Sequence, residues 1–318
     1  MNLRGVILDR DSFDRGDIDL SPLLQSLPDW SHHASSKNHQ VAKRISDCEV
    51  VITNKVVIGE QEINQAPQLK LILLAATGTD NVDLDACREK GITVCNVREY
   101  STPSVVQHTF TLILNLMTRM PRYLEDVNEK AWQQSPVFCL LNHPIRELQD
   151  KQLGIVGLGN LGSKVATVAE AFGMKVSVSQ RPGGAPQAGR VAFDQLLAES
   201  DIITLHCPLT PDTRDLFSTK EFEMMKSDAL IINTARGAII NSEALVAALR
   251  NGMIGGAGID VLDQEPPGEA HPLVQEDIPN LVLTPHNAWA SIETRQRLVS
   301  HLAANLNAWK QGNPINTV

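Results

Sequence analysis

Residues 153–166, LGIVGLGNLGSKVA, decide the fold of the second half of the chain. An apolar run leads into Gly157, Gly159 and Gly162, which have the spacing G-x-G-x-x-G. In this pattern the first glycine permits a tight turn and the second lets the backbone approach a pyrophosphate, while the third lets helix and strand pack closely. The helix that begins here would direct free N–H groups and its positive dipole end at the phosphates. The stretch therefore predicts a strand–turn–helix unit that binds a dinucleotide, in preference to an ordinary turn.

Short apolar runs rich in valine and isoleucine recur on both sides of this stretch, separated by segments of helix length. Runs that are apolar on both faces are typical of parallel strands covered on both sides, so the fold class predicted is α/β. Because the runs form two series, we expect two doubly wound parallel-sheet domains. The predicted strands are Val6–Leu8, Val50–Thr53, Leu71–Ala76 and Ile92–Cys95 in the first series, and Leu153–Leu158, Val176–Ser179, Ile202–His206, Ala229–Asn233, Gly256–Asp260 and Val282–Thr284 in the second.

One long helix is predicted between the two series, over residues 101–122, with Thr102 as its N-cap and Pro103 at its first position. The stretch after Trp289 also has helical spacing, and it has no strand partner of its own. We expect it to cross back to the first domain. Residues 1–99 and 288–318 would then form one domain, and residues 100–287 the dinucleotide-binding domain.

Composition excludes several classes of protein. The chain has 318 residues and a formal net charge of −9, which argues against a nucleic-acid-binding protein because such a protein needs a basic face. Its five cysteines are odd in number and have no C-x-x-C spacing, so neither a disulfide framework nor a zinc site is expected. The N-terminus lacks the apolar core of a signal peptide, and the longest apolar run is too short to span a membrane. We expect a cytoplasmic protein.

The strand after the glycine-rich turn lacks the acidic residue that usually binds the ribose 2′-hydroxyl of NAD. No Asp or Glu occurs between Lys175 and Phe193, and the strand leads into Gln180 and Arg181. A missing carboxylate removes the repulsion against a 2′-phosphate, and Arg181 could pair with one. This favours NADP(H) slightly over NAD(H), with hydrogen bonds from Gln180 to NAD as the alternative.

Three later segments place chemically active side chains just after predicted strands: INTARGAII, IDVLDQEPP and LTPHNAW. Since ligands bind at the carboxyl ends of strands in open α/β sheets, Arg236, Glu265 and His286 could converge there. Histidine is the usual proton donor near neutral pH, a carboxylate beside it fixes its tautomer, and a guanidinium can hold the carboxylate of an α-keto acid. Taken singly, each residue could equally be a solvated or capping loop residue.

Several motifs in order give the chain a specific resemblance: ATGTDNVDL, NVREYSTPSVVQHTF, GLGNLG, HCPLTPDTR, NTARG, GIDVLDQEPP and TPHNAW. Together they resemble the D-isomer-specific 2-hydroxyacid dehydrogenase family over nearly the whole chain, and residues 132–148 resemble its glycerate dehydrogenase (hydroxypyruvate reductase) branch. The resemblance implies a Rossmann cofactor domain inserted into a flavodoxin-like substrate domain. It implies hydride transfer between NAD(P)H and a small 2-keto acid, with His286 as acid/base, Glu265 supporting it and Arg236 binding substrate.

The resemblance also implies the remaining contacts of the site. Substrate would meet the backbone N–H groups of Thr77 and Gly78, the side chains of Arg236 and His286, and Trp289 as a wall. The cofactor would be bound by Val105, Thr109, Gly157, Gly159, Asn160, Leu161, Gly162, Gln180, Arg181, His206, Cys207, Pro208, Thr213, Thr234, Ala235 and Asp260. No metal is expected, since His206 and Cys207 fit a strand-end loop beside the adenosine better than a metal or nucleophile site, and the polar stretch with His32, His33 and His39 lacks a ligand pattern.

The family resemblance implies a homodimer joined through the cofactor domains, with the long helix and the segment through Trp132 and Phe138 at the contact. Two alternatives remain for the function. One is a dinucleotide-sensing, corepressor-like binding protein, and the other is a different 2-hydroxyacid dehydrogenase such as D-lactate dehydrogenase. Arg236, Glu265 and His286 favour an enzyme over the first alternative.

Overall fold

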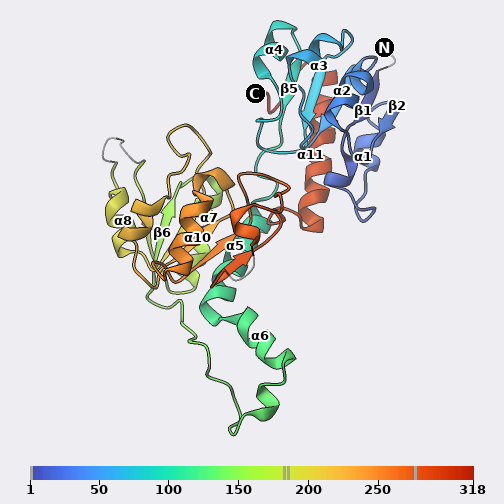
Figure 1. The fold of residues 1–318 in the computed structure, drawn as a ribbon. Helices are drawn as coiled ribbons and strands as arrows, with labels where there is room; N and C mark the ends of the chain where they lie inside the picture. Colours follow the sequence, from blue (N-terminus) through green and yellow to red (C-terminus); the bar gives the residue numbers. More distant parts are fainter. Residues whose placement is uncertain (1–2, 182–183, 185–186, 276–277) are drawn as a thin grey trace. The chain divides into compact units, whose positions relative to one another are not determined.

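A computed structural model describes residues 3–181, 184, 187–275 and 278–318. The chain divides into two compact units (Figure 1). Unit 1 comprises residues 1–101 and 289–318, and unit 2 comprises residues 102–288, so the chain passes between the units twice. Each unit contains one parallel β-sheet, which confirms the predicted fold class.

Unit 1 holds a five-stranded sheet in the order β2-β1-β3-β4-β5, the flavodoxin-like order. Its elements are β1 (Arg4–Ile7), a 3₁₀ turn (Arg10–Ser12), α1 (Ser21–Leu24), β2 (Asp29–His32), α2 (Asn38–Ile45), β3 (Val50–Thr53), α3 (Glu60–Asn64), β4 (Leu71–Leu74), α4 (Leu84–Glu89), β5 (Thr93–Cys95) and α11 (Ile292–Lys310).

Both faces of this sheet are covered, because its central strands alternate apolar side chains between two cores. Val51 and Ile72 face the core formed with α2, α3 and α4. Ile52 and Leu73 face the core formed with α1 and α11. The C-terminal helix α11 thus completes the sheet of the first hundred residues, and its buried leucines lie on one face at helical spacing.

The structure corrects one omission in unit 1. Strand β2 (Asp29–His32) was not predicted, because its sequence DWSH is polar and has no apolar run. It pairs only with β1, at the edge of the sheet, where one side of the strand does not need apolar residues. His32 therefore lies on an edge strand.

Unit 2 holds a six-stranded sheet in the order β11-β10-β9-β8-β6-β7. Its elements are α5 (Thr102–Thr118), α6 (Met120–Asn128), a 3₁₀ turn (Trp132–Gln134), β6 (Gln152–Val156), α7 (Asn160–Ala171), β7 (Lys175–Val178), α8 (Phe193–Glu199), β8 (Ile202–Leu205), α9 (Thr219–Met224), β9 (Leu230–Asn233), a 3₁₀ turn (Gly237–Ile239), α10 (Ser242–Arg250), β10 (Gly256–Ile259), a 3₁₀ turn (Pro272–Val274) and β11 (Leu281–Leu283).

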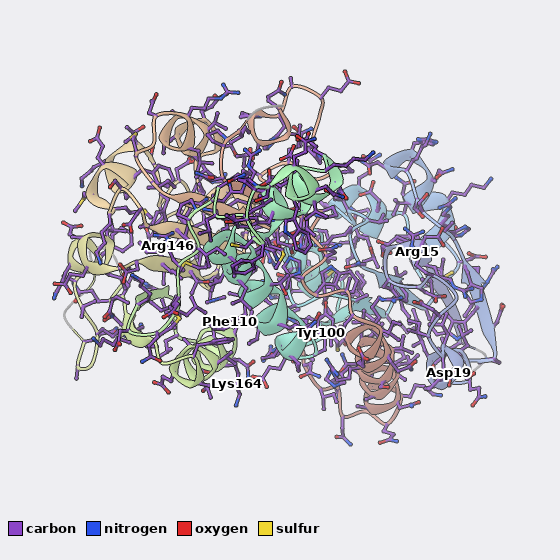
Figure 2. The ribbon with its side chains drawn as sticks, turned by 90° about the horizontal axis from the view of Figure 1, so that it is seen from below. Arg15, Asp19, Tyr100, Phe110, Arg146 and Lys164 are labelled. Atoms are coloured by element: carbon purple, nitrogen blue, oxygen red, sulfur yellow. The ribbon has the colours of Figure 1, made fainter. Side chains whose placement is uncertain are left out.

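Among the described residues, the sheet continues beyond β7 as a parallel bridge from Ser179 to Val191. With this bridge counted as a third strand, the order is that of the Rossmann fold, 3-2-1-4-5-6, followed by β11 as a seventh strand at the far edge. Helix α5 packs across the sheet and against α7. Phe110 of α5, labelled in Figure 2, stacks on Phe172 with ring centroids 5.5 Å apart. In the described part of the chain no helix is both long and apolar enough to cross a membrane.

The predicted single helix over residues 101–122 is wrong, because the structure has two helices that meet at Arg119. Arg119 has a left-handed backbone, with φ of 54°. Pro121 has no N–H with which to continue the hydrogen bonding of α5, and the carbonyl of Met117 accepts instead from the backbone N–H of Arg146 (2.9 Å). Helix α6 therefore sets off in a new direction and extends away from the sheet (Figure 1).

Candidate functional site

The glycine-rich turn has the geometry that its spacing predicts. Gly157 has φ of 100°, and a Cβ there would lie 2.7 Å from the backbone of His206 and Cys207. At Gly162 a Cβ would lie 2.1 Å from the carbonyl oxygen of Gly157, so only glycine lets α7 approach the turn this closely. At Gly159, by contrast, nothing lies within 4 Å of such an atom. This open space at the N-terminus of a twelve-residue helix fits a pyrophosphate.

A cavity of about 650 Å³ opens beside this turn. Eight of the predicted cofactor residues line it, namely Gly157, Gly159, Gln180, Arg181, His206, Cys207, Pro208 and Thr213. The remaining described lining residues are Val156, Leu158, Ser179, Gly184, Gln187, Arg190, Thr210 and Leu216. Asn160 and Leu161 begin α7, and the Thr102 hydroxyl donates to Asn160 Oδ1 (2.6 Å).

Arg190 is a cavity residue that the sequence analysis missed. The parallel bridge between Ser179 and Val191 brings it back to the end of β7, and its Nη1 donates to the carbonyl of Ser179 (3.0 Å). Arg181 lines the same cavity and is exposed. Two guanidinium groups, with no carboxylate among the described lining residues, make this end of the cavity suited to an anion.

His206 and Cys207 directly follow β8, beside the glycine-rich turn. Burial lowers the pKa of the His206 imidazole to about 4, so the ring is neutral at pH 7, and its Nε2 lies 2.9 Å from Thr204 Oγ1. Burial raises the pKa of the Cys207 thiol, which makes it a poor nucleophile. Within the described ranges no three His, Cys, Asp or Glu side chains are grouped to hold a metal ion.

Arg236 lies on the loop that follows β9. Asn233, the last residue of the strand, shapes this loop by accepting from Ala235 N (3.0 Å) and donating to the carbonyl of Arg236 (2.9 Å). The next residue, Gly237, packs so tightly on the loop after β10 that a Cβ would lie 1.9 Å from the carbonyl carbon of Leu262. The loop of Arg236 and the loop of Glu265 are therefore in direct contact.

Glu265 and His286 form the closest polar contact of these loops. His286 Nδ1 lies 2.5 Å from Glu265 Oε2, and Glu265 Oε1 accepts from the backbone N–H of Leu262 (2.8 Å). The carboxylate therefore holds the Nδ1 proton and leaves Nε2 as the atom that can take up or release a proton. Both side chains are partly exposed, at 26% for His286 and 32% for Glu265, so a ligand can reach them.

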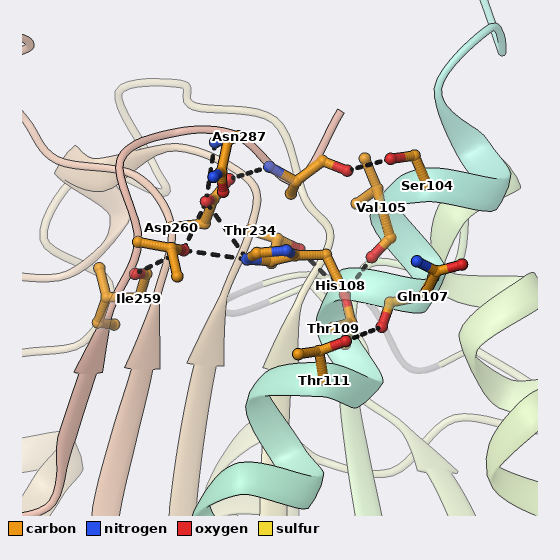
Figure 3. A network of polar contacts seen from close by, with 12 residues as sticks. Ser104, Val105, Gln107, His108, Thr109, Thr111, Thr234, Ile259, Asp260 and Asn287 are labelled. Carbon is orange, nitrogen blue, oxygen red and sulfur yellow. Dashed lines mark hydrogen bonds and ion pairs between the residues drawn. The ribbon is translucent and has the colours of Figure 1, made fainter. Parts of the chain in front are cut away.

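Hydrogen bonds to Asp260, the residue after β10, hold the turn that carries His286 in place (Figure 3). The Asp260 carboxylate is 1% exposed and accepts from the Thr284 hydroxyl (2.6 Å) and from the backbone N–H groups of Asn287 and Ala288 (3.0 Å each). Its backbone carbonyl accepts from His286 N (2.8 Å). These bonds fix His286 at φ of 51°, a left-handed conformation that is costly for a non-glycine residue.

Four further residues of the cofactor prediction lie in unit 2 away from the lining of the cavity. Thr109 of α5 is fully buried, and its hydroxyl donates to the carbonyl of Val105 (2.8 Å) and lies 3.3 Å from Thr234 Oγ1. Ala235 follows Thr234 on the loop after β9. These residues join α5 to the carboxyl end of β9, the same edge of the sheet as Asp260.

The three predicted substrate residues that remain belong to unit 1. Thr77 and Gly78 follow β4, and the Thr77 hydroxyl donates to the carbonyl of Val97 (2.8 Å). Trp289 packs edge-on against Tyr100, with ring centroids 6.5 Å apart. Asn96 Nδ2 donates to the Thr77 carbonyl (2.8 Å), which fixes the loop after β4.

Unit 2 thus combines a dinucleotide cradle with a histidine–carboxylate pair and an arginine, carried on the loops after three adjacent strands, β9, β10 and β11. A model of the D-isomer specific 2-hydroxyacid dehydrogenase NAD binding domain matches residues 110–288. A glycerate dehydrogenase of Methylorubrum extorquens is 42% identical over 279 residues, 88% of this chain and 88% of its own. A hydroxypyruvate reductase of Blautia hydrogenotrophica is 34% identical over 319 residues, 98% of each chain.

Among solved structures, an acyclic imino acid reductase (Bsp5) in complex with NADPH and D-Arg superposes with a TM-score of 0.87 and 26% identity, over 99% of this chain and 100% of its own. The family model covers more than half of the chain, and both relatives exceed 30% identity over most of their length. The catalytic chemistry available at β9–β11 agrees with these matches. The chain accordingly belongs to the D-isomer specific 2-hydroxyacid dehydrogenases, oxidoreductases that bind a nicotinamide dinucleotide.

Proposed function

We propose that this enzyme reduces a small 2-keto acid, hydroxypyruvate or glyoxylate, to D-glycerate or glycolate with a nicotinamide dinucleotide. The observation that carries the proposal is the 2.5 Å contact of His286 with Glu265, beside the Arg236 loop and in the unit that holds the glycine-rich cradle. Relatives named glycerate dehydrogenase and hydroxypyruvate reductase support this substrate class. They do not favour the alternative of a dinucleotide-sensing binding protein.

The roles follow from the chemistry of the groups. When bound, the dinucleotide supplies the hydride. Arg236 would hold the substrate carboxylate with its planar guanidinium and polarise the keto oxygen. His286, protonated at Nε2, would give its proton to that oxygen as negative charge develops, and Glu265 would stabilise the imidazolium through Nδ1.

We further propose that the backbone N–H groups of Thr77 and Gly78 bind the substrate carboxylate, and that Trp289 forms a wall of the pocket. The cofactor would lie on Gly157–Gly162, with Cys207, Pro208 and Thr213 along the adenosine. Val105, Thr109, Thr234, Ala235 and Asp260 would lie toward the nicotinamide.

Arg181 and Arg190 support a preference for NADPH. Both line the cavity at the end of β7, where NAD-dependent relatives of this fold carry an acidic residue and this chain has Gln180. A structural relative, an acyclic imino acid reductase solved with NADPH, supports this preference. Arg181→Ala and Arg190→Ala should each reduce kcat/KM for NADPH more than for NADH, and Gln180→Glu should shift preference toward NADH, because a carboxylate repels the 2′-phosphate. A parent enzyme that prefers NADH, with ratios unchanged by either arginine variant, would contradict the proposal.

Initial rates test the reaction itself. Hydroxypyruvate, glyoxylate and pyruvate should each be offered with NADH and with NADPH, and the first two should give the highest kcat/KM. His286→Ala should lower kcat by about 10²–10⁴-fold while dinucleotide binding survives, since proton transfer contributes about that much. His39→Ala is the matched control, because His39 is exposed on α2. Near-parent rates for His286→Ala would exclude the assigned role.

We also propose a homodimer formed through α6 and the segment that follows it. Large apolar side chains are exposed there, with Leu124 56%, Trp132 53%, Phe138 90% and Leu141 82% accessible. Large apolar side chains exposed in one segment support an interaction with another protein surface. Light scattering of the parent should give a dimer mass, and Phe138→Ser with Leu141→Ser should shift it toward the monomer. The free thiols of all five cysteines support a cytoplasmic location.

A further inference from the structure

Helix α5 reaches the turn that carries His286 with two side chains one helical turn apart. Ser104 Oγ donates to the carbonyl of Ala288 (2.7 Å), and His108 Nε2 lies 3.0 Å from Thr284 Oγ1 and 3.4 Å from Asp260 Oδ1 (Figure 3). Residues four apart lie on one face of a helix, so both groups face the turn. The turn is therefore held by Asp260 on one side and by α5 on the other.

Counting protons fixes the state of the His108 ring. The Thr284 hydroxyl has one proton, and its shortest contact is with Asp260 Oδ1 at 2.6 Å, against 3.5 Å to the carbonyl of Ile259. The carboxylate is an acceptor, so the hydroxyl must donate to it. Thr284 Oγ1 can then only accept from His108, and Nε2 of His108 must carry a proton.

We propose that His108 is a positioning residue for His286. Its Nε2–H donates to Thr284 Oγ1 and faces the Asp260 carboxylate. His108 thereby completes the set of hydrogen-bond donors around this carboxylate, which is almost entirely buried. An incompletely paired buried carboxylate would draw the backbone of residues 284–288 into another arrangement. Because His286 adopts a left-handed conformation in this turn, relaxation of the turn would rotate its imidazole away from the substrate.

This role predicts a specific kinetic pattern. Proton transfer from His286 takes place only in the transition state, so a misplaced imidazole lowers kcat and leaves KM for the dinucleotide nearly unchanged. A displacement of about 1 Å can cost about 100-fold in rate. His108→Leu, which retains volume but has no donor, should lower kcat between about 10- and 100-fold.

Rescue separates positioning from simple packing. In His108→Gln the amide nitrogen stands as many bonds from Cα as the imidazole Nε2 and can donate to Thr284, so kcat should return to within about threefold of the parent, within the scatter of such measurements. Gln107→Leu is the matched control, because this neighbouring α5 residue is exposed. All kcat values should be normalised to the fraction of protein that binds dinucleotide. Equal losses in the Leu and Gln variants, or no loss in the Leu variant, would overturn the proposal.

A second measurement needs no substrate and does not depend on the proposed reaction. In protein labelled with ¹⁵N-histidine, the His108 ring, assigned by comparison with His108→Gln, should show the Nε2–H tautomer at pH 8. Thr284→Val should broaden or shift that signal, because it removes the acceptor. An Nδ1–H tautomer would overturn the proposal even if the enzyme reduces hydroxypyruvate. A correct tautomer together with inactivity toward every keto acid would retain the network and reject the proposed function.

Discussion

The tight approach of Gly237 to the loop after β10 allows a sharp test of the site. In Gly237→Ala the new Cβ would lie 1.9 Å from the Leu262 carbonyl carbon and 2.2 Å from Asp263 N. Ordinary van der Waals contact begins at 3.4 Å, so the two loops must separate by about 1.5 Å. Both opposing atoms belong to backbone, and no flexible side chain can move aside to absorb the methyl group.

The displacement is transmitted to His286. Leu262 N donates to Glu265 Oε1, and Glu265 Oε2 contacts His286, so a shift of Leu262 moves the histidine–carboxylate pair away from Arg236. A misplacement of about 1 Å costs about 100-fold in rate, and we expect a loss in kcat of that order. Overpacking should also cost about 1–3 kcal/mol of folding free energy, which lowers Tm by about 2–4 °C per kcal/mol.

Gly268→Ala is the matched control. Gly268 lies on the same loop, and nothing lies within 4 Å of a Cβ placed there. The assay is kcat with saturating keto acid and dinucleotide, together with a thermal melt and a dinucleotide titration of both variants. Dinucleotide affinity should be nearly unchanged in both, because neither residue lines the cradle. Parent-like kcat in Gly237→Ala, or equal losses in the two variants, would refute the coupling of these loops to His286.

Three further perturbations test other parts of the molecule. Arg236→Lys should raise KM for the keto acid and lower kcat, because lysine keeps the charge but loses the planar fork; steady-state constants equal to the parent's would contradict this. Gly159→Ala should leave Tm unchanged and weaken dinucleotide binding by about tenfold or more in calorimetric titration, since the methyl group enters the open space of the cradle. Hydrogen bonds from Arg295 hold the pKa of Asp17 at about 2, below its ordinary 3.8. The pair therefore stabilises the fold above pH 3.8 and loses this contribution as the pH falls toward 2, so Asp17→Asn should flatten the pH dependence of urea unfolding in that range.

The sequence was most informative about the central strands. Strands such as β4 and β9 are buried on both faces, and side chains on both faces must therefore be mostly apolar, which gives a nearly continuous apolar run in the sequence. Edge strand β2 has no such requirement and was missed. The break at Arg119 did leave a signal, because Pro121 is tolerated in the first turn of a helix but not in its interior, yet the apolar period of α5 outweighed this signal in the prediction.

The site was predictable where topology alone positions residues. Arg236, Glu265 and His286 follow adjacent parallel strands, whose carboxyl ends share one edge of the sheet. Arg190 was not predictable, because a one-residue bridge leaves no apolar pattern to show that the chain returns to β7. The proposed role of His108 depends on the rotation of α5 about its axis and on which groups donate and accept hydrogen bonds at Thr284. Neither can be read from the spacing of residues in the sequence.

The bridge between Ser179 and Val191 has a consequence for how the cofactor preference of such an enzyme can evolve. The segment between these two residues can vary in length and composition at small cost to the fold, because loop closure depends only weakly on length. Arg181 and Arg190 belong to this segment, whereas His286 and its partners lie beyond the opposite half of the sheet. On the roles proposed above, the residues that would discriminate NADPH from NADH are therefore separate from those that would transfer the proton. Substitutions in this segment could then change the preferred cofactor without altering the residues around His286.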